Sequence, residues 1–144
     1  MEKFGIAAVE AATGCTAKDI ANWKRRNLLS VPLEPSGRGK IRGYSRDNIY
    51  EFALLSELSK LGIPLAKARG IAGGMRGKFI SATNHWFLLW NPAAPDGSSM
   101  LRWEQIDRNA LFPDKSRRRS VAIVSIAQIL DDVDAALARF AQPT

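Results

Sequence analysis

The chain has 144 residues, of which 46% are apolar and 24% charged, and its 21 Lys and Arg outnumber its 14 Asp and Glu to give a formal net charge of +7. This composition is typical of a globular protein and excludes a disordered chain. A single cysteine, Cys15, excludes a disulfide framework and a four-cysteine zinc site, and the single histidine, His85, leaves too few histidines for a histidine-based metal or hydrolase centre. We therefore expect no metal, no cofactor and no enzymatic activity.

The sequence also predicts a soluble, cytoplasmic protein. The longest nearly apolar run, residues 121–130, is interrupted by Ser125 and Gln128 and is too short to span a bilayer. The N-terminus has no basic start followed by an uninterrupted apolar stretch, so it does not resemble a secretory signal. We expect no contact with a membrane.

The positive charge is concentrated in the first half of the chain. Residues 1–78 contain 14 Lys and Arg against 7 Asp and Glu, whereas residues 79–144 contain 7 of each. Residues 16–46 alone contain eight basic and two acidic residues. Such a segment is typical of a protein that binds a polyanion, although a basic surface can also serve only solubility. We favour double-stranded DNA as the partner, which places the protein at the nucleoid when it is bound.

Glycines divide the chain into two parts. Gly73, Gly74 and Gly77 lie close together and are expected to end the preceding helix at Ala72 and to form a linker. We predict a DNA-binding domain over residues 1–74 and a small α+β module over residues 78–144. The predicted fold class is mainly α with β.

The first two helices have the spacing of a helix-turn-helix. A short alanine-rich helix begins at Ile6 and ends before Gly14, because glycine adopts the left-handed conformation that follows a helix. Thr16 and Asp19 then form a capping-box pattern that opens a second helix, residues 16–26. Two short helices joined by a glycine turn predict a helix-turn-helix.

The second helix has the pattern of a DNA-recognition helix. At 100° per residue, Ile20 and Trp23 share one face and are expected to point into the core. The opposite face carries cations, an amide and a methyl group, which are side chains that read guanine, adenine and thymine: Lys18, Ala21, Asn22 and Arg25. Lys24 and Arg26 add positive charge at the end of this helix. An ordinary solvent-exposed face would also be polar, but this face contains no acid.

The segment 31–44 is expected to form a basic β-hairpin, because its prolines and glycines exclude a helix. A basic hairpin after a helix-turn-helix is a wing that lies along the DNA backbone. Arg38 and Lys40 are then phosphate contacts and not sequence readers. The alternative is a solvated basic loop.

Two further helices complete the first domain. Ser45 is a candidate cap for a helix that runs to about Leu61, and apolar residues on two stripes predict that this helix packs on two sides. Gly62 ends it, and a short fourth helix follows Pro64 over residues 65–72.

Several motifs in this half resemble the MerR family of transcription regulators. The family opening I-G-E-V-A-x-x-T-G-V-S-x-x-T-L-R-Y-Y-E-R-x-G-L-L is similar to residues 6–29, which contain Ile-Ala-Ala-Val, Thr-Gly-Cys-Thr and Trp-Lys-Arg-Arg-Asn-Leu-Leu. The R-x-Y-S-x-x-D-[LI] segment is similar to residues 42–49, and the L-G-[FM]-S-L junction is similar to residues 61–65. The resemblance covers about residues 5–72, in one register apart from the hairpin.

The resemblance implies a winged helix-turn-helix that reads DNA as a dimer. It implies that Thr16 approaches a phosphate, that Trp23 is the second aromatic residue of the recognition helix, that Arg25 is its terminal arginine, and that Arg42 follows the wing. The family's Arg-Tyr pair is Ala21-Asn22 in this chain, and its long dimerisation helix is replaced by Gly73-Gly74 and an extended segment. Together with the face described above, the candidate DNA contacts are Thr16, Lys18, Ala21, Asn22, Trp23, Lys24, Arg25, Arg26, Arg38, Lys40 and Arg42.

The second half is predicted to form about three antiparallel strands and a C-terminal helix. Strand patterns cover residues 79–90, 101–106 and 120–125, and an apolar stripe that begins at Ile126 predicts the helix. Three tryptophans, Trp86, Trp90 and Trp103, could line a ligand pocket, but core or interface positions are commoner. His85 is interpreted as a surface or hydrogen-bonded strand residue. The basic run 117–119 is interpreted as a solvated loop, with a contact to the flanks of the DNA site as the alternative.

These observations predict a sequence-specific DNA-binding protein, a bacterial transcription regulator that acts as a dimer through its second module. The second helix would enter the major groove and the wing would lie on the backbone. The alternatives are an excisionase-like accessory factor that bends DNA, and an interaction module that has kept the winged-helix shape but binds protein through its aromatic second half.

Overall fold

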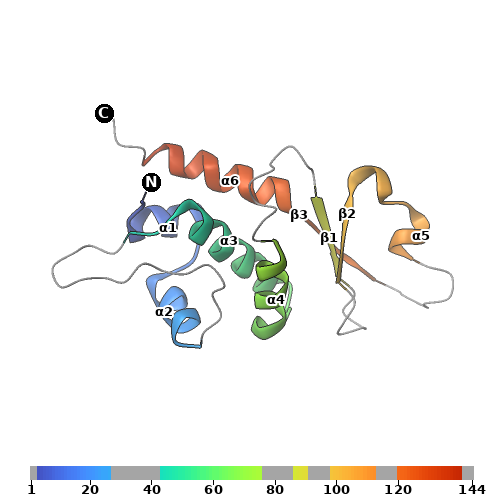
Figure 1. Cartoon of the computed structure of the whole chain (residues 1–144), viewed down its shortest axis with the longest axis horizontal. Helices are drawn as coiled ribbons and strands as arrows, with labels where there is room; N and C mark the ends of the chain where they lie inside the picture. Colours follow the sequence, from blue (N-terminus) through green and yellow to red (C-terminus); the bar gives the residue numbers. More distant parts are fainter. Residues whose placement is uncertain (1–2, 27–42, 76–85, 91–97, 113–119, 141–144) are drawn as a thin grey trace. The chain divides into compact units, whose positions relative to one another are not determined.

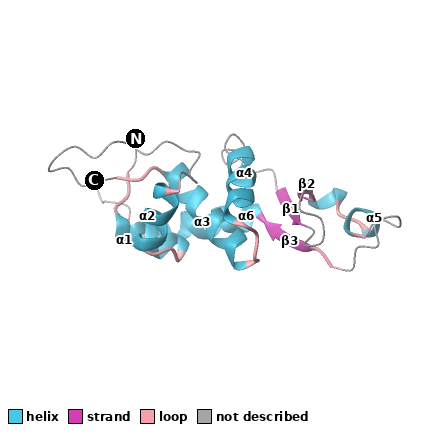
Figure 2. Cartoon of the chain, turned by 90° about the horizontal axis from the view of Figure 1, so that it is seen from below, coloured by secondary structure: helices cyan, strands magenta, loops and turns pink. Residues whose placement is uncertain are grey.

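A computed structural model describes residues 3–26, 43–75, 86–90, 98–112 and 120–140 of the chain (Figure 1). The described residues form two compact units. The first comprises Met1–Ile80 and Ile129–Thr144, and the second comprises Ser81–Gln128. Helices dominate the first unit and a small sheet lies in the second (Figure 2). The predicted class, mainly α with β, is confirmed.

The first two helices, α1 (Ile6–Thr13) and α2 (Ala17–Arg25), form as expected from their caps. Gly14 has φ 72°, and its N–H donates to the carbonyl of Glu10 at 2.9 Å, which closes α1. The Thr16 hydroxyl accepts a hydrogen bond from the N–H of Asp19 at 3.1 Å, and the Asp19 carboxylate accepts one from the N–H of Thr16 at 3.0 Å. This reciprocal pair is the predicted capping box, and it fixes the start of α2.

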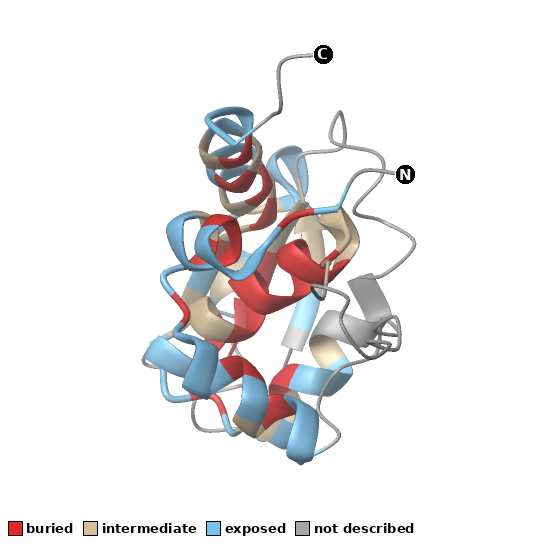
Figure 3. Cartoon of the chain, turned by 90° about the vertical axis from the view of Figure 1, so that its left-hand side faces the viewer, coloured by how far each residue is buried: buried red, intermediate tan, exposed pale blue. Residues whose placement is uncertain are grey.

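The helix α3 (Arg46–Lys60) is the centre of the first unit. Ser45 caps it together with Asn48, as the sequence predicted for Ser45. Every residue from 48 to 55 is buried, so α3 is enclosed on all sides over two turns (Figure 3). The sequence predicted packing on two sides, and α1 and α4 (Leu65–Met75) both pack against α3. In addition, the side chains of Arg46 and Tyr50 contact Asp134 of the C-terminal helix.

The helix α4 (Leu65–Met75) differs from the prediction at its end. The glycine cluster was expected to end it at Ala72, but the helix continues through Gly73 and Gly74 to Met75. A glycine inside a helix costs only about 1 kcal/mol relative to alanine. Two glycines without a proline therefore weaken the helix and do not break it.

The C-terminal helix α6 (Ile126–Ala138) lies in both units of the chain. From Ile129 onward it belongs to the first unit, whereas the sequence analysis placed all of residues 78–144 in a separate module. Its buried stripe includes Leu130, Val133 and Leu137 at helical spacing. The sequence predicted this stripe but could not indicate that the helix packs with the helix-turn-helix unit.

The second unit contains a three-stranded antiparallel sheet with the order β2-β1-β3. The strands are β1 (Trp86–Trp90), β2 (Ser98–Arg102) and β3 (Ala122–Ser125). Leu88 pairs with Met100 on one side and Val124 on the other, which fixes the register. Residues 79–85 of the predicted first strand, including His85, lie outside the described residues, as does the basic run 117–119.

The second strand is shifted from its predicted position. Residues 101–106 were expected to be extended, but β2 ends at Arg102 and Trp103–Gln105 forms a 3-10 turn. The Gln105 side chain accepts a hydrogen bond from the Arg102 N–H at 2.9 Å. This local bond stabilises the turn over the extended strand that the alternating apolar pattern predicted. A one-turn helix, α5 (Arg108–Leu111), follows and is capped by Asp107. This helix was not predicted from the sequence.

Candidate nucleic-acid interface

The inward face of α2 holds the helix on the core of the first unit. Ile20 is buried, and Trp23 is only 6% exposed, with its ring centroid 6.1 Å from that of Phe52 on α3. Tyr44 contacts the same Phe52 ring edge-on, at 5.6 Å. These contacts fix which side of α2 is left to face solvent.

The outward face of α2, formed by Lys18, Ala21, Asn22 and Arg25, is the face that the sequence predicted. Lys18, Ala21 and Arg25 are exposed and Asn22 is half-buried. Arg25 Nη2 donates a hydrogen bond to Asn22 Oδ1 at 2.9 Å, so two of the four side chains are held together. Lys24 and Arg26 are also exposed, and they add two cations at the end of the helix.

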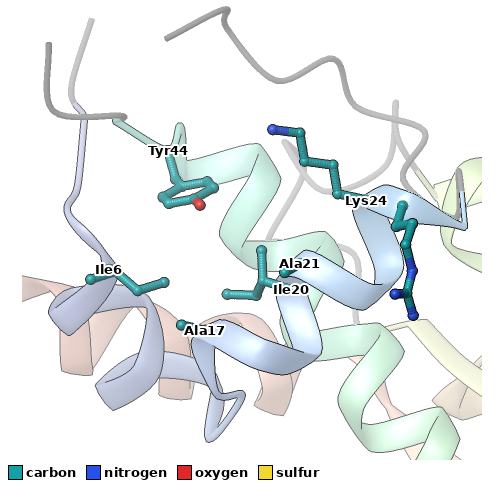
Figure 4. A pocket seen from close by; sticks show the side chains of 7 residues that line it. Ile6, Ala17, Ile20, Ala21, Lys24 and Tyr44 are labelled. Atoms are coloured by element: carbon teal, nitrogen blue, oxygen red, sulfur yellow. The ribbon is translucent and has the colours of Figure 1, made fainter. Parts of the chain in front are cut away.

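Two hollows flank this face. The first has a volume of about 630 Å³ and is mostly apolar, with Tyr44 and Ile6 on one side and α2 on the other (Figure 4). The α2 residues that line it are Ala17, Ile20, Ala21, Lys24 and Arg25. The second, of about 500 Å³, is lined by Lys18, Asp19, Ala21, Asn22 and Arg25. Both open to solvent beside exposed cations.

The chain next to Tyr44 is tied to the N-terminal segment. Phe4 and Tyr44 exchange two backbone hydrogen bonds, N–H to carbonyl, each 2.9 Å long. A Cβ added to Gly43 would lie 2.8 Å from Cβ of Lys3, so only glycine fits this approach. These contacts anchor the end of the segment 31–44 where it enters α3.

Neither a metal site nor a membrane span is found in the part of the chain that the structure describes. No group of three or more His, Cys, Asp or Glu there is arranged to hold a metal ion. None of the described helices is long and apolar enough to cross a membrane. The thiol of Cys15 is buried, and burial raises its pKa above the ordinary value.

The model of the MerR HTH family regulatory proteins matches residues 4–74. The match covers α1 to α4 and the segment between α2 and α3. Residues 4–74 are a MerR-type DNA-binding domain. A search of curated proteins gave no match for the chain. The match confirms the resemblance inferred from the sequence motifs.

The structure places the predicted DNA contacts of the MerR-type domain in three groups. Lys18, Ala21, Asn22 and Arg25 lie on the outward face of α2, and Thr16, Lys24 and Arg26 are exposed beside it. Trp23 is in the core against Phe52, so its side chain holds α2 on α3 and has little surface left for a contact with DNA. Arg38, Lys40 and Arg42 lie outside the described residues, together with nearly all of the predicted hairpin 31–44.

Two residues that lie beside the outward face of α2 were not predicted from the sequence to be there. Ile6 and Tyr44 line the apolar hollow beside α2, although they come from the start of α1 and from the residue that precedes the α3 cap. The sequence predicted only that a helix begins at Ile6. In the structure Ile6 lies in the first turn of α1 and is 39% exposed, so it is at the surface beside α2.

Proposed function

We propose that the protein is a sequence-specific regulator of transcription that binds double-stranded DNA as a homodimer, with α2 in the major groove and the segment 31–44 on the backbone. The outward face of α2 carries this proposal: Lys18 and Arg25 offer cations, Asn22 an amide and Ala21 a methyl group. These are the groups that distinguish base pairs from the major groove. DNA binding and transcription regulation agree with the family match over residues 4–74.

The neighbouring residues suit the DNA backbone. Thr16, Lys24 and Arg26 are exposed at the two ends of α2, where phosphates flank a helix in the major groove. The apolar lining of the hollow between Tyr44 and α2 suits a deoxyribose ring. The ammonium group of Lys24, which also lines the hollow, would then bind the adjacent phosphate. Arg38, Lys40 and Arg42 follow α2 in the sequence and are three further cations that we assign to the DNA backbone.

The second unit supports dimerisation. Trp103 is 66% exposed and Ile123 on β3 is 46% exposed, and large apolar side chains at the surface are common where chains associate. The three tryptophans do not share one environment, since Trp90 is buried and Trp103 is exposed. The pair of exposed residues therefore favours an interface over a ligand pocket, and a different protein partner is the second candidate for it.

We propose that the protein acts in the bacterial cytoplasm, at the nucleoid when it is bound to DNA, and works without a catalytic residue, metal or cofactor. MerR-type regulators are generally not enzymes, which agrees with this proposal. Among the described residues, the site contains cations, the Asn22 amide, the Thr16 hydroxyl and apolar groups, and the carboxylate of Asp19 beside them caps α2. This set suits a polyanion and is not arranged for acid–base or nucleophilic chemistry.

The test of DNA recognition is the selection of binding sites for the full chain from a random DNA pool. We expect a palindrome whose half-site spacing reflects a two-fold dimer. Arg25→Ala should weaken the selected sequence preference, whereas Arg139→Ala, which removes an exposed arginine after α6, should leave it unchanged. Equal affinity for selected and scrambled duplexes would refute the proposal.

The dimer needs its own test, because deletion of residues 78–144 would also remove α6 from the first unit. We therefore propose Trp103→Ala with Ile123→Ser in the full chain, followed by sedimentation. The double variant should be monomeric and should bind a half-site. The matched control is Leu61→Ser, which removes an exposed apolar side chain from the first unit. A double variant that stays dimeric would move the interface away from these residues.

A further inference from the structure

The hydrogen bond between Arg25 and Asn22 determines which atom of the asparagine amide faces the guanidinium. Arg25 Nη2 lies 2.9 Å from the amide, and a guanidinium has only donors. The facing atom must therefore be the acceptor, Oδ1. The two residues are three positions apart, so the bond runs along one face of α2 and needs no change in the helix.

This arrangement limits what Asn22 can recognise. An asparagine reads adenine with both ends of its amide, because Oδ1 accepts from the adenine N6 amino group and Nδ2 donates to N7. In the structure Arg25 already engages Oδ1. The groups that the pair still presents are mostly donors, namely Nδ2 of Asn22 and the remaining N–H groups of Arg25.

Guanine is the base that matches a set of donors. Its major-groove edge carries two neighbouring acceptors, O6 and N7, and arginine pairs with both at once. Holding the guanidinium in place before binding also reduces the rotamer freedom that is lost on complex formation. The hollow of about 500 Å³ beside Asn22 and Arg25 leaves room for a base edge next to the pair.

We propose that Arg25 reads a guanine through O6 and N7, and that Asn22 is a positioning residue that orients Arg25 and does not read adenine. The proposal rests on the proposed function, since it assigns a base to the face of α2 that is placed in the major groove. It replaces the adenine contact that the sequence alone suggested for Asn22.

The experiment uses the full chain and the duplex selected from a random pool. The base position read by Arg25 is the one at which Arg25→Ala loses its preference. At that position the wild-type protein should prefer guanine to adenine, and Arg25→Ala should reduce this ratio by about 5- to 150-fold. Replacing the guanine with 7-deazaguanine, which lacks the N7 acceptor, should weaken the wild-type protein and have little effect on Arg25→Ala.

Two variants of Asn22 separate positioning from reading. Asn22→Ala removes the acceptor and should lower the guanine-to-adenine ratio by about 2- to 10-fold. Asn22→Asp keeps an oxygen acceptor for Arg25 but has no amide donor, so the ratio should return toward the wild-type value. The added charge lowers affinity for every duplex, and for this reason the ratio is the quantity to compare. Arg139→Ala should leave the ratio unchanged.

Opposite results have separate meanings. Asn22 would be the residue that reads the base if three results were found at one position. The wild-type protein would bind adenine there more tightly than guanine, 7-deazaadenine would weaken that binding, and both Asn22→Ala and Asn22→Asp would abolish the preference. That result overturns the inference and leaves the proposed function standing. Failure to select any sequence from the pool would overturn both.

Discussion

The Arg46 guanidinium lies 2.5 Å from the Asp134 carboxylate and joins the start of α3 to the C-terminal helix, 88 residues later in the chain. The Tyr50 hydroxyl donates to the same carboxylate oxygen at 2.6 Å. Arg46 also lies over the Phe4 ring, 5.5 Å from its centroid, and Phe4 pairs with Tyr44. A series of contacts therefore runs from α6 to Tyr44, at the end of the segment 31–44 that leads into α3.

Loss of the Asp134 carboxylate should destabilise the protein. Asp134→Ala removes one ion pair and one hydrogen bond to a charged group, but Arg46 and Asp134 are 34% and 42% exposed, so water screens the pair. We expect a loss of about 1 kcal/mol in the free energy of unfolding, measured by urea denaturation. The control is Asp131→Ala, which removes an exposed acid from the same helix and should change stability little. Equal effects of the two variants would show that the contact contributes nothing.

The pair between Tyr50 and Asp134 predicts a loss of stability at high pH. Burial, together with the hydrogen bond to Asp134, raises the pKa of Tyr50 from 10.0 to about 12. Because the folded state favours the neutral phenol, this contribution is complete below pH 10 and is lost as the pH rises from 10 toward 12. Urea midpoints of the wild type should therefore fall over this range more steeply than those of Tyr50→Phe. Parallel pH profiles would contradict the raised pKa.

The local features of the fold follow from the sequence, and the long-range ones do not. The capping box of Thr16 and Asp19 and the left-handed Gly14 depend on residues within three or four positions, so their patterns are sufficient to predict them. The ion pair between Asp134 and Arg46 joins two charged residues of helices that are far apart in the sequence. Each is partly exposed, and no sequence pattern indicates that the two are partners.

The same distinction applies to the candidate site. The helical period predicted the outward face of α2 and the burial of Trp23, because both depend on one helix. It could not predict that Tyr44 and Ile6 close a hollow beside that face, since this requires the pairing of Phe4 with Tyr44. Nor could it predict that Arg25 bonds Asn22, because several rotamers of both side chains suit an exposed helix.

Substitution of Gly43 tests the anchor of the segment 31–44. A Cβ at this position would lie 2.8 Å from both Cβ and Cδ of Lys3, so in Gly43→Ala either Lys3 or the backbone beside Tyr44 must shift. We expect a loss of about 1–3 kcal/mol in stability. Gly70→Ala is the matched control, because nothing lies within 4 Å of its added Cβ and it is inside α4. This control should stabilise the protein by about 0.5–1 kcal/mol.

The salt dependence of DNA binding should separate phosphate contacts from base contacts. Lys24, Arg38 and Lys40 are assigned to the backbone, so replacing any one with alanine should weaken all duplexes about equally. Each replacement should also reduce the slope of log affinity against log salt by about 0.9 per protomer, because one fewer counterion is released. Arg25→Ala should instead reduce the difference between selected and scrambled duplexes by about 1–3 kcal/mol, because guanine discrimination is lost with the guanidinium. Titrations of both duplexes at several salt concentrations measure the two quantities together. If Lys24→Ala changed the sequence preference as strongly as Arg25→Ala, Lys24 would have to lie at a base edge. The side of α2 that faces the bases would then include Lys24 and would be rotated from the face formed by Lys18, Ala21, Asn22 and Arg25.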